Sequence, residues 1–133
     1  MKTRDVMTTP AQCCSPNDSL EQVAEMMWDY ELHAIPAVDA RGRPVGWVTD
    51  RAICMTTLRA GARLADLEAR QALLLGIPAV HQDLPAGRLA EAMTRCGSEW
   101  LVVVDDAGVV TGVVTVGDLA RASAPASRMR LTG

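Results

Sequence analysis

The feature that most constrains this chain is an internal repeat. The stretch from Gly46 to Ile53 reads GWVTDRAI, and the later stretch from Gly112 to Leu119 reads GVVTVGDL. Both contain a glycine, two apolar residues and a threonine, but the second has Asp118 where the first has Ala52. Self-similarity at a fixed period indicates one structural unit used twice. The 133 residues are therefore expected to form two similar halves.

We refer to the displacement along the chain from Gly46 to Gly112 as the repeat offset. Upstream of the octets it also aligns Ala24 with Ala90, Met27 with Met93, and Gly42 with Gly108. Nearer the N-terminus the register changes, because Asp5-Val6-Met7 resembles Asp66-Leu67-Glu68 at a shorter displacement. This change predicts an insertion of about five residues within the stretch ARQALLLG.

Each half predicts the same order of elements. A short extended segment (11–15 and 77–81) precedes a helix, a buried strand (34–39 and 100–105), a glycine turn and a second strand (43–49 and 109–115). A second helix starts directly after each octet's threonine. Asp18 with Glu21 predicts a capping box for the first helix, and Asp83 with Pro85 predicts the start of its counterpart. Apolar residues at helical spacing predict the buried faces: Leu20, Val23, Ala24, Met27 and Tyr30, then Ala86, Leu89, Ala90 and Met93.

The predicted fold class is therefore mixed α/β (α+β), with two β-α-β-β-α motifs related by a pseudo-twofold axis and sharing one core. The first motif, with its N-terminal segment, is expected over 1–60 and the second over 61–124. Residues 125–133 are small and polar with a proline, which predicts a flexible C-terminal tail.

Composition excludes several classes of protein. The net charge is −3 with a single lysine and no basic run, so neither DNA nor RNA is an expected partner. No signal peptide and no apolar run of about 18 residues is present, which predicts a cytoplasmic chain without a membrane partner. The cysteines at 13, 14, 54 and 96 are expected to be reduced, with a redox role for Cys13-Cys14 as the alternative. His33 and His81 have no ligand-spaced partner, so no metal site and no required cofactor are predicted, and no catalytic motif indicates an enzyme.

The two octets resemble the signature of the cystathionine β-synthase (CBS) domain, in which an Asp follows the Thr or Ser by three residues. The AIPAVD strand and the RDVMTTP segment are also similar to that family, and the resemblance covers about residues 3 to 122. It implies a tandem pair of motifs that binds adenosine derivatives, regulates another protein without catalysis, and dimerises into a disk of four motifs. The sequence departs from the family pattern at Ala52 and at Val102, which replaces the counterpart of Pro36, and it contains no attached effector domain.

A ribose site needs an acceptor for two vicinal hydroxyls, and a carboxylate at a helix start supplies one. Asp118 with Thr115 is predicted to bind ribose, although Asp118 could also serve only as a helix cap. In the first half Thr49 keeps the hydroxyl but Ala52 has no acceptor. The first site is therefore expected to be degraded, with adenosine bound at least about tenfold to a hundredfold more weakly.

The family's symmetry implies that residues of the first half, namely Arg51 and His33, contact the phosphates of a ligand in the Asp118 cleft. Arg51 could instead be a solvated arginine, and His33 a packing residue. The matching second-half positions are Gly117 and Glu99, which suit a phosphate poorly. For adenine the resemblance implies a slot lined by Pro78, Ala79, Val80 and Val102. Trp100 could shield a base or pack against a dimer partner.

The resulting hypothesis is a regulatory module for signal transduction that binds one adenine nucleotide (AMP, ADP or ATP) per chain and acts on an unidentified partner protein. The alternatives are an S-adenosylmethionine-binding module and a ligand-free dimerisation scaffold. A homodimer is expected to bury apolar residues of the second helix of each motif: Ile53, Met55, Leu58 and Leu119.

Overall fold

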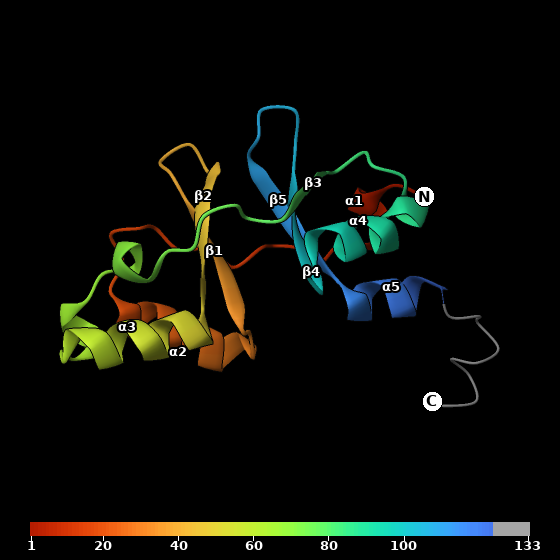
Figure 1. The fold of residues 1–133 in the computed structure, drawn as a ribbon. Helices are drawn as coiled ribbons and strands as arrows, with labels where there is room; N and C mark the ends of the chain where they lie inside the picture. Colours follow the sequence, from red (N-terminus) through yellow and green to blue (C-terminus); the bar gives the residue numbers. More distant parts are fainter. Residues whose placement is uncertain (124–133) are drawn as a thin grey trace. The chain divides into compact units, whose positions relative to one another are not determined.

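The computed structural model describes residues 1–123, and the predicted tail at 125–133 lies outside them (Figure 1). The fold contains both helices and strands, as the sequence predicts. It divides into two compact units. Unit 1 comprises Met1–Ala11, Pro78–Ala107 and the described residues from Thr111, whereas unit 2 comprises Gln12–Ile77 and Gly108–Val110. Among the described helices, none is both long enough and apolar enough to cross a membrane.

Unit 2 is built around an antiparallel hairpin. Helix α2 (Leu20–Tyr30) leads to strands β1 (Ala34–Val38) and β2 (Pro44–Thr49), and helix α3 (Asp50–Ala60) follows directly. Two 3₁₀ helices, η1 (Leu64–Asp66) and η2 (Ala69–Ala72), complete the unit. The turn between the strands contains Gly42 at φ +82°, a left-handed conformation that glycine adopts without strain.

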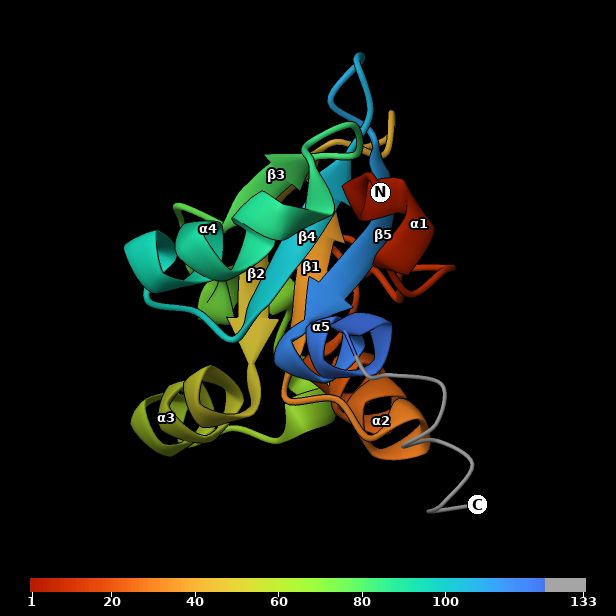
Figure 2. The same ribbon diagram turned by 90° about the vertical axis from the view of Figure 1, so that its right-hand side faces the viewer.

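Unit 1 contains a three-stranded sheet in the order β3-β4-β5 (Figure 2). Strand β3 (Ala79–His81) pairs in parallel with β4 (Trp100–Val104), and β5 (Val110–Thr115) is the other neighbour of β4. Helices η3 (Ala86–Arg88) and α4 (Leu89–Cys96) connect β3 to β4, and α5 (Val116–Ser123) follows β5. The short N-terminal helix α1 (Thr3–Val6) also belongs to this unit.

The repeat predicted from the sequence is confirmed element by element. The repeat offset carries both ends of β1 and β2 onto those of β4 and β5, and it carries the start of α3 onto the start of α5. The parallel bridge between Cys14 and Ala37 is the counterpart of the pairing between Val80 and Val103. Each unit has its own cluster of buried apolar residues, with fully buried members at equivalent positions: Val23, Ile35 and Val48 in unit 2, and Leu89, Leu101 and Val114 in unit 1.

The predicted five-residue insertion is wrong. Thr3 N–H donates to Leu84 O at 2.8 Å and Ala69 N–H donates to Asp18 O at 2.7 Å, and the repeat offset relates Thr3 to Ala69 and Asp18 to Leu84. The antiparallel bridges from Thr8 to Val113 and from Leu74 to Trp47 are related in the same way. One register therefore holds throughout, and α1 corresponds to η2. Backbone pairing tolerates different side chains, so the sequence similarity faded although the geometry repeats.

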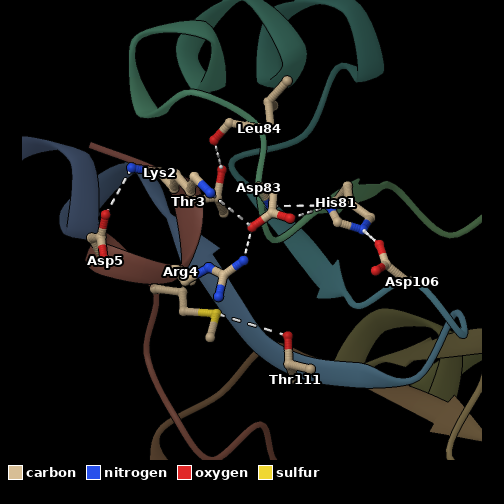
Figure 3. Close-up of polar contacts among 10 residues, drawn as sticks. Lys2, Thr3, Arg4, Asp5, His81, Asp83, Leu84, Asp106 and Thr111 are labelled. Atoms are coloured by element: carbon tan, nitrogen blue, oxygen red, sulfur yellow. Dashed lines mark hydrogen bonds and ion pairs between the residues drawn. The ribbon is translucent and has the colours of Figure 1, made fainter.

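The N-terminal segment is attached to the second repeat rather than to the first (Figure 3). Thr3, which is fully buried, donates from both its backbone N–H and its hydroxyl to Leu84 O, each at 2.8 Å. Arg4 N–H donates to Gln82 O at 3.0 Å, and the guanidinium of Arg4 forms an ion pair with Asp83. The compact units thus do not coincide with the successive chain segments 1–60 and 61–124, which remain our prediction for the extent of the two motifs.

Several local predictions need correction. Helix α2 is capped by Ser19 with Gln22, because the Asp18 carboxylate instead accepts from Ser15 N–H at 2.8 Å in the preceding turn. Tyr30 lies at the end of α2 and is 56% exposed, so it does not belong to the buried face. Ile53 is 7% exposed and belongs to the core of its own unit.

Candidate functional site

Asp118 lies at the start of α5 and is almost fully buried, with 4% of its surface exposed. Its carboxylate accepts from Thr115 N–H at 2.9 Å, and its own N–H donates to the Thr115 hydroxyl at 3.1 Å. This reciprocal pair is a capping box. The structure therefore brings the two predicted ribose residues together and shows that Asp118 caps the helix. Capping uses only part of the carboxylate, which has about four acceptor positions.

Two further groups, both missed by the sequence analysis, bind the same carboxylate. The Thr8 hydroxyl lies 3.0 Å and 3.2 Å from its two oxygens, and the Arg121 guanidinium forms an ion pair with it. Arg121 is one helical turn beyond Asp118 and could have been found from that spacing. No pattern in the sequence indicates Thr8, which an antiparallel bridge to Val113 places at this point of the fold.

The glycines of the two octets have a specific structural role. A Cβ atom on Gly112 would lie 2.7 Å from Met7 Sδ and 2.8 Å from Thr8 O. A Cβ atom on Gly46 would lie 2.6 Å from Leu74 O, at the equivalent contact. Each glycine thus allows another segment of its unit to lie directly against the strand, and in unit 1 that contact brings Thr8 to Asp118.

The equivalent place in unit 2 is an open groove. The Thr49 hydroxyl accepts from Ala52 N–H at 3.0 Å, so the helix cap is kept without the carboxylate. A cavity of about 410 Å³ lies between α3 and the segment 71–74, and Thr49, Arg51 and Ala52 all contribute to its lining. The predicted loss of the acceptor in the first motif therefore leaves a groove with an arginine beside it.

His33 lines a different cavity from Arg51, although it contacts Asp50, the residue before Arg51. Its Nδ1 lies 2.8 Å from Asp50 Oδ2, and the hydrogen bond from His33 is the main cause that lowers the pKa of Asp50. The His33 side chain is 90% exposed, so this pair contributes little to stability. The cavity has a volume of about 550 Å³ and is lined by residues that include Trp28, Leu32 and Ile53.

Unit 1 has a cavity of about 430 Å³ at the equivalent position. The repeat offset relates its lining residues to those of the His33 cavity, with Thr94 in place of Trp28, Glu99 in place of His33 and Val116 in place of Asp50. The repeat therefore preserves an apolar hollow on each unit but changes the polar residues around it.

The four residues predicted for the adenine slot are neighbours in the sheet of unit 1. Ala79 lies beside Val102 in the parallel pair, and Val102 N–H donates to Pro78 O at 2.9 Å. The side chain of Val80 packs against the core cluster that contains Leu101 and Val103. A contact between Val80 and a base would therefore have to come from its backbone.

The vicinal cysteines are not activated thiols. Burial raises the pKa of Cys13, and it raises the pKa of Cys14 to about 12. A nucleophilic cysteine needs the opposite shift, since the thiolate is the reactive form. This direction opposes the redox alternative for Cys13-Cys14.

One group of side chains in unit 1 combines a histidine with two carboxylates (Figure 3). His81, Asp83 and Asp106 place one potential ligand atom each within 4.8 Å of one another. Asp83 N–H donates to His81 Nδ1 at 3.0 Å, so the proton of the neutral ring is on Nε2, which lies 2.6 Å from Asp106. Asp83 also pairs with Arg4 and Lys2. The prediction that His81 has no ligand-spaced partner is therefore wrong, because two carboxylates lie beside it.

The family assignment follows from this geometry together with a direct match. The CBS domain family model matches residues 4–56 and 75–125, which is more than half of the chain and includes both octets. This chain belongs to the CBS domain family. It carries two CBS repeats, and Asp118 lies within the second.

Relatives of known sequence match most of this chain at modest identity. The uncharacterized protein MK0525 of Methanopyrus kandleri is 25% identical over 87% of this chain and 57% of its own length. L-aspartate semialdehyde sulfurtransferase of Methanocaldococcus jannaschii is 25% identical over 89% of this chain. This chain spans only 22% of that enzyme's length.

Three solved structures show the same fold at low identity. The crystal structure of Hypoxic Response Protein I with two coordinated zinc ions has a TM-score of 0.81 at 23% identity, covering 94% of this chain and 100% of that one. The CBS domain pair of MJ0100 in complex with 5-methylthioadenosine and S-adenosylmethionine has a TM-score of 0.76 at 24% identity, covering 92% and 94%. CBSX2 in complex with AMP has a TM-score of 0.77 at 19% identity, covering 97% and 98%.

Proposed function

We propose that this CBS domain pair is a non-catalytic regulatory module that binds one adenine nucleotide per chain through Asp118. The observation that carries the proposal is the buried carboxylate at the start of α5, with hydroxyls of Thr8 and Thr115 beside it. Two structural neighbours are complexes with adenosine compounds, namely AMP in CBSX2, and methylthioadenosine with S-adenosylmethionine in MJ0100. All three compounds contain a ribose diol, whose hydroxyls can donate to a carboxylate.

The ribose would bind by exchange of hydrogen bonds. The Asp118 carboxylate would accept from both vicinal hydroxyls while Thr115 N–H keeps it in place, and Thr8 and Arg121 would give up part of their contact. A hydrogen bond to a charged acceptor contributes about 1.5–3 kcal/mol. Because the existing contacts with Thr8 and Arg121 must be partly given up, the net binding free energy is smaller than the sum of the new hydrogen bonds. This site therefore favours ligands that offer both hydroxyls at once.

The remaining parts of the ligand are assigned by the symmetry of the repeat. Arg51 and His33 are proposed to contact phosphates, because both offer cationic or hydrogen-bonding donors at the positions where the other repeat has Gly117 and Glu99. Pro78, Ala79 and Val102 are proposed to contact the adenine, with Val80 contributing its backbone. AMP, ADP or ATP is the proposed ligand, and S-adenosylmethionine is the second candidate.

The proposed assembly is a homodimer that forms a disk of four motifs. In support, both units present an equivalent apolar hollow. Each hollow is lined by an exposed apolar side chain, Trp28 at 85% exposed in unit 2 and Val116 at 50% exposed in unit 1. Leu58 of α3 is 73% exposed as well. A second copy with the same two faces would cover them. Light scattering at high micromolar concentration should report twice the 14.2 kDa chain mass, and a particle of one chain would overturn the assembly.

The regulated protein is a separate partner in this proposal, and the cytoplasm is the proposed location.

The competing hypothesis is a scaffold that has lost ligand binding. Calorimetry with AMP, ATP and S-adenosylmethionine separates the two and also gives the stoichiometry. One site per chain supports the proposal, whereas two equivalent sites would contradict it. A scaffold would give no heat and no shift of melting temperature, although a ligand at 100 times its Kd should stabilise the fold by about 2.7 kcal/mol.

A further inference from the structure

The groove beside Ala52 differs in charge from its counterpart at Asp118. It lies along one face of α3, where Ala52, Met55 and Arg59 recur at helical spacing opposite the segment 71–74. Among the described residues that line it, two are arginines and none is a carboxylate. The groove is therefore positively charged, although the chain as a whole has a net charge of −3.

The two arginines of the groove, Arg51 and Arg59, make no ion pair with any residue among those that the structure describes. Other arginines of unit 2 do have such partners. Arg63 lies 3.3 Å from Asp66, and Arg70 lies 2.9 Å from Glu68. The guanidinium groups that border the groove thus retain their donors for a ligand.

The two repeats differ in the side chains at this place. Ala52 stands where unit 1 has Asp118, and Met55 stands where unit 1 has Arg121. In unit 1 this carboxylate and this guanidinium pair with each other. In unit 2 both positions are apolar, and a volume of about 410 Å³ lies between the helix and segment 71–74.

The floor of the groove is apolar and its sides are polar. Ala72 is buried, Leu73 is half-buried, and Met55 is 36% exposed. The hydroxyls of Thr49 and Thr56 and the amide of Gln71 supply uncharged polar groups. A volume of this size is within the range of small-molecule sites, which combine an apolar wall with a few polar groups.

We infer that this groove is a second ligand site, which binds a small organic phosphate with an apolar body and does not require a ribose diol. The arginines would hold the phosphate, since a guanidinium can donate two parallel hydrogen bonds to it. The apolar body would cover Met55 and Leu73. The loss of the carboxylate in the first repeat therefore changes the ligand class of this site instead of only weakening it.

Calorimetry of the full chain with hexyl phosphate tests this inference, with hexanol and inorganic phosphate as the separate halves of the probe. Hexyl phosphate should bind at one site per chain, and each half should bind at least about tenfold more weakly, because each lacks one set of contacts. The absence of hexyl phosphate binding, or equal binding of hexanol, would overturn the inference.

Variants locate the site. Arg59→Gln should weaken hexyl phosphate about tenfold or more, whereas the matched control Arg63→Gln should leave it unchanged. Ala52→Asp should abolish hexyl phosphate binding by placing a negative charge beside the ligand. The same change should instead allow adenosine to bind there. Unchanged binding of hexyl phosphate in both Arg59→Gln and Ala52→Asp would show that the site is elsewhere.

The groove and the proposed nucleotide site share Arg51, so Asp118 and Arg59 are the residues that distinguish them. Asp118→Ala should leave hexyl phosphate binding unchanged, and Arg59 has no role in the proposed nucleotide contacts. If AMP and ATP fail to bind but hexyl phosphate binds and depends on Arg59, the groove inference holds and the nucleotide proposal falls. If nucleotides bind and hexyl phosphate does not, the nucleotide proposal holds and the groove inference falls. Melting curves of each variant confirm that the fold is retained.

Discussion

Replacement of Asp118 by alanine is the most informative change, because one side chain serves both the fold and the proposed ribose site. In the structure the carboxylate accepts from Thr115 N–H at 2.9 Å and from the Thr8 hydroxyl at 3.0 Å. Loss of the cap costs about 1 kcal/mol, and loss of the Thr8 acceptor costs about 1 kcal/mol more. The ion pair with Arg121 adds little, since that side chain is 68% exposed. We expect Asp118→Ala to destabilise the fold by about 2 kcal/mol in urea unfolding.

The effect on ligand binding should be larger than the effect on stability. Two ribose hydroxyls donating to a carboxylate contribute about 1.5–3 kcal/mol each, and the lower value applies because existing partners must be displaced. The expected loss is about 3 kcal/mol, which corresponds to roughly a hundredfold weaker AMP binding. Calorimetry with AMP and 2′-deoxy-AMP measures it directly. The unaltered chain should prefer AMP about tenfold, and Asp118→Ala should lose this preference.

Thr8→Val provides the matched control for this experiment. It removes the hydroxyl that competes for the carboxylate but keeps Asp118 itself, so it should destabilise the fold by about 1 kcal/mol and bind AMP at least as tightly. Asp106→Ala removes a carboxylate whose side chain is 94% exposed, and it should alter neither property. AMP binding that is unchanged in Asp118→Ala, or a preference for AMP over 2′-deoxy-AMP that persists there, would refute the ribose assignment.

Three other outcomes follow from the same contacts. Arg51→Ala should weaken ATP more than adenosine in calorimetry, since it removes a phosphate donor and leaves the ribose contacts. Gly112→Ala should lower the free energy of unfolding by about 2 kcal/mol, because its Cβ would lie 2.8 Å from a backbone oxygen of the N-terminal segment. Gly87→Ala, whose Cβ would meet nothing within 4 Å, should leave stability nearly unchanged. Cys14, with a pKa of about 12, should be alkylated far more slowly at pH 8 than the exposed Cys54.

The sequence alone determined the architecture of the repeat. Strong local signals specified the two hairpins: glycine at each turn, alternating or continuous apolar residues in each strand, and a threonine at the start of each following helix. These signals depend on near neighbours in the chain, so they survive in both copies. The same comparison identified Asp118 and Ala52 as the position where the two repeats differ chemically.

The tertiary structure decided which segments complete each unit. The N-terminal residues belong with Pro78–Ala107, and they bring Thr8 to the carboxylate of Asp118. Sequence comparison missed this because the contacts that both repeats share, such as the bridges of Thr8 and Leu74, are made by backbone atoms. Thr8 and Leu74 occupy equivalent places in the fold, yet their side chains share no property that an alignment could recognise. The charge of the groove beside Ala52 was hidden for a related reason. It comes from Arg51 and Arg59, which the fold places beside Ala52 with no carboxylate among the described lining residues.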